Sequence, residues 1–313
     1  MVAPLRSLHP AGAAPTWTGL PPPKVRDAVR TRVIAGIVAI PIFVIPIWLG
    51  GIFVLLLGLT VTILAVMEFY FMADAGGYKP IRLIGVPMAI ILFLSGWNPD
   101  DVQRNATSLT GVLQAPTRLI VEWVSYPTVT VLTLGLIFML IYSLFVHDHP
   151  LSSFMSTAMG AIYIGVLMSQ VVALRFWENG LWYFFWGLLV TWTNDIFAYF
   201  VGVTMGKHKL WPRLSPKKTW EGTIGGWVGA ALMGSILAVA MPLPIGYIFG
   251  AIVGFIAGVL ALFGDLAVSM IKRQVGIKDS GTLFPGHGGM LDRLDSLLFT
   301  LPFIYQMIFL FRR

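Results

Sequence analysis

The sequence predicts an all-α, polytopic integral membrane protein with about nine transmembrane helices, and three observations support this prediction. Hydrophobic residues make up 57% of the 313 residues, whereas charged residues make up only 11%. Much of the apolar sequence lies in runs of about 17 residues or more, which is long enough to cross a hydrocarbon core of ~30 Å. Most of the charged residues lie in the stretches between these runs. A single soluble core could not bury this much apolar material.

Nine apolar runs are predicted as membrane spans, with ends accurate to several residues. They cover residues 32–48, 51–72, 81–97, 127–146, 154–174, 181–203, 223–241, 245–263 and 294–311. Several runs are close to the lower length limit, so the first two are alternatively a bent or re-entrant pair. Pro41 and Pro46 predict a kink in the first run. Residues 1–31 are expected to be a retained, mostly disordered basic tail.

The distribution of lysine and arginine predicts the orientation. With a cytoplasmic N-terminus, sixteen of the 21 basic residues fall in cytoplasmic segments and five fall outside, as the positive-inside rule requires. The net charge of +7 is then explained without nucleic acid as a partner. The two polar connections, 204–222 and 264–293, are both placed in the cytoplasm by this topology. They can therefore contribute to one site.

The first polar cluster interrupts the sixth apolar run at Asn194 and Asp195. An aspartate at the centre of a membrane helix costs about 2.5–3.5 kcal/mol on insertion scales, so Asp195 is expected to face a polar cavity and to have a partner. The alternative is that both side chains only form hydrogen bonds with neighbouring helices.

The second cluster precedes the seventh run and reads LSPKKTWEG over residues 214–222. Lys217 and Lys218, followed by Thr219 and a predicted helix start, bring ammonium groups, a hydroxyl group and free backbone N–H groups together. Such a group of donors suits phosphate oxygens. The alternative is a loop anchored to anionic lipid, which would leave Glu221 without an explanation.

The third cluster extends from Ser269 to Asp295, with Asp265 just upstream. Asp292 and Asp295 are three residues apart, which predicts that they share one face of the helix that starts the ninth span. Carboxylates gathered at a membrane surface, in a chain with no cysteine and no clustered histidines, suit a hard cation such as Mg²⁺. Helix capping is the alternative for this acidic pair.

A glycine-rich turn within the third cluster holds His287, Gly288 and Gly289. Glycines allow the backbone to approach a ligand closely, and nearby basic side chains would neutralise a polyphosphate. His287 has two open interpretations, a catalytic group or a histidine that only forms hydrogen bonds within the turn.

The spacing of the third cluster resembles the signature of the phosphatidate cytidylyltransferases, also called CDP-diacylglycerol synthases. The residues that carry the resemblance are Ser269, Lys272-Arg273, Lys278-Asp279, Gly281, Phe284-Pro285, His287-Gly288-Gly289, Asp292-Arg293 and Asp295. Residues 194–202 and 214–222 resemble other segments shared by this family. The resemblance therefore covers about the last 120 residues.

The resemblance implies transfer of the cytidylyl group of CTP to phosphatidic acid in phospholipid biosynthesis, with CDP-diacylglycerol and pyrophosphate as products. It implies catalytic roles for Asp265, Asp292, Lys272, Arg273 and His287. Substrate phosphates would contact Ser215, Lys217, Lys218, Thr219, Lys278, Gly288, Gly289 and Arg293. Mg²⁺ is the expected cofactor, with a second cation, divalent or K⁺, and the expected metal ligands are Asp265, Asp292, Asp195 and Asp295.

The expected organisation is a single transmembrane catalytic domain over residues 32–313. The N-terminal spans cover 32–174 and the catalytic half covers 181–311. The expected partners are CTP, phosphatidic acid and the lipid bilayer, with a homodimer left open and no nucleic acid. We expect a multi-pass protein of a bacterial inner or plasma membrane, with its active site on the cytoplasmic side.

Two other functions remain open from the sequence. A CTP-dependent lipid kinase of the polyprenol type would transfer the γ-phosphate to an alcohol and should need a base, for which His287 is a candidate. A membrane transporter would require carboxylates near the middle of the bilayer and pairs of broken helices. The acidic residues here gather instead at the predicted cytoplasmic ends of the spans.

Overall fold

The computed structural model describes residues 40–95, 128–145, 149–284 and 288–311. The predicted tail over residues 1–31 and His287 lie outside these ranges. The first described helix runs from Ile40 to Leu49. The other elements are α2 (Gly51–Ala75), α3 (Arg82–Ser95), α6 (Thr128–Ser143), α7 (Pro150–Phe176), α8 (Gly180–Met205), β1 (Lys209–Trp211), β2 (Ser215–Thr219), α9 (Trp220–Ala240), α10 (Tyr247–Gln274), α11 (Leu291–Leu294) and α12 (Leu297–Phe311).

The helical, membrane-type fold predicted from the sequence is confirmed in its coarse form. Each predicted span corresponds to an apolar helix in the described part of the chain, but only five of these helices have the length and composition to cross a membrane. The five are α2, α7, α8, α9 and α10. The other apolar helices have 10–17 residues. The prediction of nine crossings and the predicted orientation of the N-terminus therefore stay predictions.

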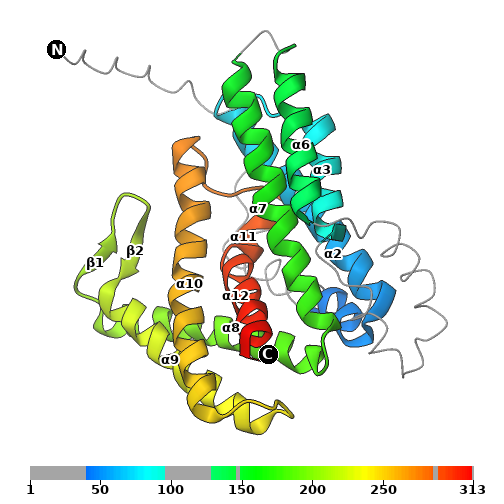
Figure 1. Ribbon diagram of the computed structural model, residues 1–313. Helices are drawn as coiled ribbons and strands as arrows, with labels where there is room; N and C mark the ends of the chain where they lie inside the picture. The colour runs from blue at the N-terminus through cyan, green and yellow to red at the C-terminus, as the bar shows by residue number, and fades with distance from the viewer. Residues whose placement is uncertain (1–39, 96–127, 146–148, 285–287, 312–313) are drawn as a thin grey trace.

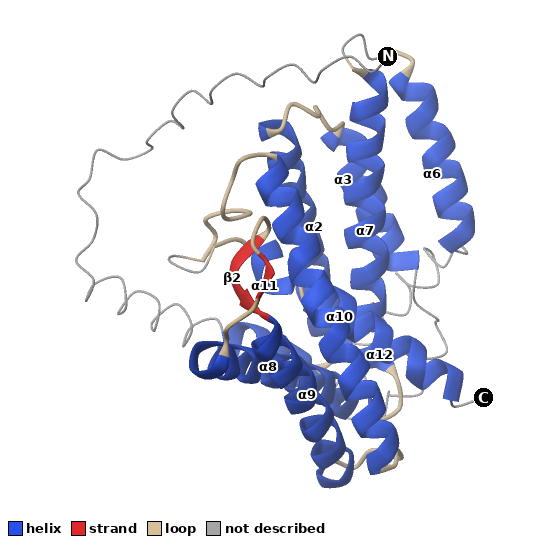
Figure 2. Cartoon of the chain, turned by 90° about the vertical axis from the view of Figure 1, so that its left-hand side faces the viewer, coloured by secondary structure: helices blue, strands red, loops and turns tan. Residues whose placement is uncertain are grey.

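Two groups of helices build the molecule (Figures 1 and 2). The helices α2, α3, α6 and α7 pack together, and α8, α9 and α10 form the second group. The helix α12 contacts both α7 and α10, so it joins the two groups. In the first group Tyr70 of α2 donates a hydrogen bond of 2.8 Å from its hydroxyl to the carbonyl of Thr157 on α7.

Close packing of α9 on α10 depends on small residues. A Cβ atom at Gly234 would lie 2.3 Å from the carbonyl oxygen of Gly250 and 3.1 Å from the Cα atom of Gly254. Glycine at these positions lets the two backbones approach, as is common where membrane helices pack. This approach holds α10 firmly against the helix that begins directly after the β hairpin.

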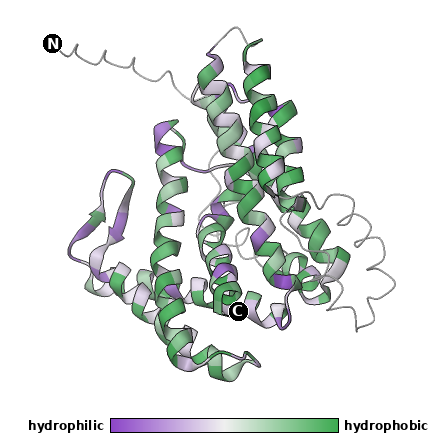
Figure 3. Cartoon of the chain, viewed as in Figure 1, coloured by the Kyte–Doolittle hydropathy of each residue, from purple (hydrophilic) through white to green (hydrophobic). Residues whose placement is uncertain are grey.

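The helix α10 is longer than the sequence predicted. The eighth span was expected to end at residue 263, but the helix continues to Gln274, so Asp265, Ser269 and Lys272 lie on its last turns rather than in a loop. The hydropathy of the sequence falls at Asp265, but the helical hydrogen bonds continue to Gln274. Ser269 lies one helical turn after Asp265, and its hydroxyl donates a hydrogen bond of 3.1 Å to the Asp265 carboxylate. Figure 3 shows hydrophilic residues at this end of α10 and on the hairpin.

Asp292 and Asp295 were expected on the helix that starts the ninth span, but α12 begins only at Leu297. Asp292 lies instead on the separate four-residue helix α11, and Asp295 follows as its C-cap with helical backbone angles, φ −47° and ψ −53°. The sequence also gave no sign of the antiparallel hairpin β1–β2, in which Lys209 pairs with Thr219. Both strands are short and lack alternating hydrophobicity, which is the usual signal of a strand.

Candidate functional site

A polar cavity of about 480 Å³ lies between the hairpin and the helices α8, α9 and α10. Asp195 of α8 and Asp265 of α10 line it from the helices, while Lys217 and Lys218 line it from strand β2. The structure therefore brings together the first and second polar clusters and the beginning of the third. Asp195 lines this cavity together with the lysines of β2.

Lys218 and Asp265 form an ion pair across this cavity. The Nζ atom of Lys218 lies 2.5 Å from Oδ2 of Asp265, and both side chains are about one-third exposed, at 27% and 34%. The pair connects the end of β2 to α10. Asp195 lies nearby and accepts a hydrogen bond of 3.2 Å from the side-chain amide of Asn194.

Glu221 has a clear structural role at the base of the hairpin. Its carboxylate accepts hydrogen bonds from the backbone N–H groups of Lys207 and His208, at 3.1 and 3.2 Å, and contacts the His208 ring at 2.6 Å. Thr219 begins α9 as its N-cap, because its hydroxyl accepts a hydrogen bond of 3.2 Å from the N–H group of Gly222. These contacts join the chain before β1 to the first turn of α9, directly after β2.

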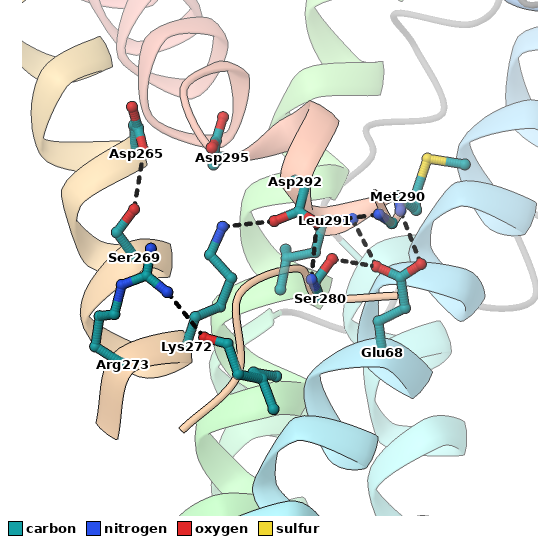
Figure 4. Close-up of polar contacts among 12 residues, drawn as sticks. Glu68, Asp265, Ser269, Lys272, Arg273, Ser280, Met290, Leu291, Asp292 and Asp295 are labelled. Atoms are coloured by element: carbon teal, nitrogen blue, oxygen red, sulfur yellow. Dashed lines mark hydrogen bonds and ion pairs between the residues drawn. The ribbon is translucent and has the colours of Figure 1, made fainter. Parts of the chain in front are cut away.

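Asp292 forms the centre of a second polar group, drawn in Figure 4. Lys272 donates to its Oδ1 atom at 2.6 Å, and the N–H groups of Ser280 and Gly289 donate to Oδ2 at 2.7 and 3.0 Å. Burial alone would raise the pKa of Asp292, but the bonds from Lys272, Gly289 and Ser280 bring this pKa below its ordinary value. Asp292 is therefore ionised and well bonded.

Asp295 has a different environment from Asp292. Burial and the negative charge of Asp265 raise the pKa of Asp295 to about 7. The carboxylates of Asp195, Asp265 and Asp295 act on one another electrostatically, whereas Asp292 is neutralised by Lys272. Mutual repulsion of this kind is relieved when a cation binds among the carboxylates.

Glu68 of α2 also belongs to this group, although it was absent from the predicted site. Its carboxylate accepts hydrogen bonds from the Ser280 hydroxyl and from the backbone N–H groups of Met290 and Leu291, at 2.8, 2.7 and 2.9 Å. A signal was present in the sequence, because Glu68 is an ionisable residue within the apolar run 51–72. The same reasoning identified Asp195.

A second cavity, of about 550 Å³ and lined mainly by apolar side chains, lies between the first helix, α2, α7, α8 and α12. Its polar end holds Asp195, Asp292, Arg293 and Asp295. Asp195 lines this apolar cavity as well as the polar one. The two cavities therefore meet at Asp195.

The remaining predicted site residues are placed less centrally. Lys278 and Arg273 are exposed, and Arg273 donates to the carbonyl of Ile277 at 3.1 Å beyond the end of α10. Ser215 lies at the start of β2, and Gly288 adopts a positive φ of 83°. The N–H group of Gly289 donates to Asp292, so it is already bonded.

The carboxylates provide oxygen donors suited to Mg²⁺, although no three acidic or histidine side chains among the described residues lie close enough to form a complete metal site. Mg²⁺ is usually held by one or two protein carboxylates together with substrate phosphates and water, so a complete protein cage is not required. The lysine ammonium groups on Asp265 and Asp292 occupy positions where a cation would be attracted. The residues present therefore fit the ion.

The apolar helices and the two adjoining cavities with their carboxylates and basic side chains are those of a multi-pass membrane protein with a polar site among its helices. Residues 30–311 match the model of the cytidylyltransferase family. The chain therefore belongs to this family.

Several curated proteins are similar to this chain, and each is named phosphatidate cytidylyltransferase. The protein from Bacillus subtilis is 44% identical over 154 residues, which are 49% of this chain and 57% of that protein. The protein from Staphylococcus haemolyticus is 31% identical over 88% of this chain and 97% of its own length. The protein from Synechocystis sp. is 32% identical over 89% of this chain and 96% of its own length.

Proposed function

We propose that this protein transfers the cytidylyl group of CTP to phosphatidic acid, giving CDP-diacylglycerol and pyrophosphate. The observation that carries the proposal is the meeting of a lysine-lined polar cavity and an apolar cavity at Asp195. A nucleotide triphosphate and a lipid need binding surfaces of these two kinds. Family membership and the names of the relatives support the same reaction.

The polar cavity is the proposed site for CTP. Lys217 and Lys218 provide two ammonium groups from one strand, and Lys209 of β1 lines the same cavity. Positive side chains held at a fixed position stabilise triphosphate charge and the charge that develops on departing pyrophosphate. Lys218 would leave Asp265 when CTP binds, because the phosphates then compete for its ammonium group.

The apolar cavity is the proposed site for phosphatidic acid. Val54, Val61, Met168 and Leu301 provide a surface for acyl chains, and Arg293 at the polar end provides a cation for the phosphate head group. A lipid placed in this way has its head group near Asp195, beside the polar cavity. Both substrates can then be bound together with their phosphates facing one another.

The chemistry requires few groups from the protein. The phosphate oxygen of phosphatidic acid is already anionic at neutral pH, so it can attack the α-phosphate of CTP without a dedicated base. The bond from the lipid oxygen to the α-phosphorus forms as the bond to the β-phosphate oxygen breaks, and pyrophosphate leaves. Positioning and charge neutralisation then provide the rate enhancement.

Mg²⁺ is part of the proposal, with Asp265 as its first ligand and Asp292, Asp195 and Asp295 as the other candidate donors. When bound, the ion would neutralise phosphate charge. Asp292 can join this set only if Lys272 moves from its Oδ1 atom, to which it is bonded at 2.6 Å. Lys272 would then be free to contact phosphate, as Lys218 would be after leaving Asp265.

The polar cavity is proposed to open to the cytoplasm, because CTP does not cross membranes and the positive-inside rule places the hairpin there. Cysteine labelling of intact cells would test on which side of the membrane the polar cavity opens. A cysteine introduced at the exposed position Lys278 should react only with reagents that enter the cell; labelling by an impermeant reagent would reverse the orientation.

The reaction itself is tested with radiolabelled CTP and phosphatidic acid in detergent micelles. Label in the α-phosphate should enter lipid, whereas label in the γ-phosphate should leave with pyrophosphate. Lipid labelled only from the γ-phosphate would instead indicate a lipid kinase, and unlabelled lipid in both cases would reject both functions.

A further inference from the structure

We infer that Glu68 is a positioning residue for cytidylyl transfer, which acts from α2 by holding the loop between α10 and α11. This inference rests on the proposed function. The loop covers residues 275–290, of which 285–287 lie outside the described residues. Glu68 has no place among the predicted ligands of CTP, phosphatidic acid or metal.

The first observation is that Glu68 bonds to both ends of the loop. The part that follows α10 donates to the Glu68 carboxylate through the Ser280 hydroxyl at 2.8 Å. The part that leads into α11 donates through the N–H groups of Met290 and Leu291 at 2.7 and 2.9 Å. Three donors to one carboxylate form a set that neither a shorter side chain nor a neutral one can satisfy. The loop is therefore fastened to a helix more than 200 residues away in sequence.

The second observation is that Ser280 bonds Glu68 and Asp292 at the same time. Its hydroxyl donates to Glu68, while its backbone N–H group donates to Asp292 at 2.7 Å. Asp292 in turn bonds Lys272 at 2.6 Å, and both side chains are nearly buried. A displacement of Ser280 therefore changes the position of the Asp292 carboxylate (Figure 4).

The third observation is the tight fit around Glu68. A Cβ atom at Gly289 would lie 2.3 Å from Oε2 of Glu68, and one at Gly281 would lie 2.7 Å from Oε1. Both distances are shorter than van der Waals contact, so glycine is required for the carboxylate to reach the backbone. Gly281 and Gly289 therefore leave the space that the Glu68 carboxylate occupies, and these three residues are called the Glu68 unit below.

The location of the Glu68 unit predicts which substrate would be bound less well if the loop were loosened. Met290 and Asp292 line the apolar cavity, whereas neither they nor Glu68 lines the polar cavity. Loosening the loop should therefore disturb the placement of phosphatidic acid and the transfer step, and should affect CTP, whose proposed site is the lysine-lined polar cavity, much less. A residue with only a role in folding would lower the amount of active protein, which reduces kcat but leaves the KM for phosphatidic acid and the Kd for CTP unchanged.

The test compares Glu68→Gln with Asp74→Asn, a matched control on the same helix whose carboxylate pairs instead with the exposed Arg82. In Glu68→Gln we expect kcat/KM for phosphatidic acid to fall at least tenfold, with a raised KM for phosphatidic acid, while the Kd for CTP changes less than twofold. Asp74→Asn should match the unmodified protein. A loss confined to kcat with an unchanged KM for phosphatidic acid, an equal loss of CTP affinity, or full activity in Glu68→Gln would overturn the inference.

A double-mutant cycle and hydrogen exchange separate this inference from the proposed reaction. Ser280→Ala should cost less than Glu68→Gln, and the double variant should be no slower than Glu68→Gln alone, because both changes release the same arm. Exchange at the amides of Met290 and Leu291 should accelerate at least tenfold in Glu68→Gln. Unchanged exchange contradicts the inference, whereas an unmodified protein without transferase activity contradicts the proposed function.

Discussion

Lys218 and Asp265 contact one another at 2.5 Å across the polar cavity, so a predicted phosphate ligand and a predicted metal ligand are paired in the structure. The lysine comes from the hairpin and the aspartate from α10. Each charge is therefore balanced by the other when substrate is absent. On binding of Mg²⁺ and CTP, this ion pair would be replaced by two contacts, one from Asp265 to Mg²⁺ and one from Lys218 to the CTP phosphates.

The variant Lys218→Ala should raise the KM for CTP at least tenfold, because a cation facing the triphosphate is lost. Initial rates at varied CTP and fixed phosphatidic acid measure this change. Lys207→Ala is the matched control, since Lys207 is an exposed lysine of the same connection that does not line the cavity. An unchanged KM in Lys218→Ala would leave the hairpin with the lipid-anchoring role only.

The variants Asp265→Asn and Asp292→Asn should both abolish Mg²⁺-dependent turnover but should differ in stability. Asp292 and Lys272 are nearly buried, with side-chain exposures of 6% and 11%, whereas Asp265 is 34% exposed. Removing one member of a buried ion pair costs about 3–5 kcal/mol, far more than breaking an exposed pair. Thermal unfolding in detergent should therefore show a large decrease in Tm only for Asp292→Asn.

Binding of Mn²⁺, followed by electron paramagnetic resonance, tests the metal assignment without a rate measurement. Asp265→Asn should weaken binding at least tenfold in the presence of CTP. Retained affinity in this variant would remove Asp265 from the ligand set.

The low pKa of Asp292 predicts how stability changes with acid. A carboxyl group whose pKa is lower in the folded protein stabilises the fold fully above its ordinary pKa of 3.8, and this contribution is lost as pH falls through the folded-state value. Unfolding midpoints measured between pH 6 and pH 3 should fall more steeply for the unmodified protein than for Asp292→Asn. Parallel curves would mean that Lys272 and the loop amides do not stabilise the charged form.

The variant Glu221→Ala should raise the KM for CTP about three- to tenfold, because the hairpin loses the acceptor for two backbone N–H groups and a histidine. His208→Ala removes only one of these donors and should cause a smaller change. The same steady-state assay measures both variants, and equal effects would mean that the ring contact, rather than the backbone contacts, orders the hairpin.

The sequence was sufficient to predict the helical fold and to select most of the polar residues that line the two cavities. A bilayer requires long apolar helices, so the length of the apolar runs predicts the helices, and charged residues within or beside these runs stand out. The sequence did not reveal where α10 ends, since hydropathy falls at Asp265 although the helix continues for more than two turns to Gln274. It also did not reveal that a separate four-residue helix, α11, carries Asp292 and is capped by Asp295 before α12 begins. Glu68 could have been singled out as an ionisable residue in an apolar run, but its partners could not, because they lie more than 200 residues away in the sequence.

The position of Asp195 on the walls of both cavities has a kinetic consequence. At the proposed substrate sites a nucleotide and a lipid would not displace one another, so both would be present when the transfer occurs. Double-reciprocal plots should then intersect rather than run parallel, as expected for a ternary complex and not for a covalent cytidylyl-enzyme. Pyrophosphate should compete with CTP, because it would occupy the proposed triphosphate site, and CDP-diacylglycerol, which carries parts of both substrates, should compete with each of them.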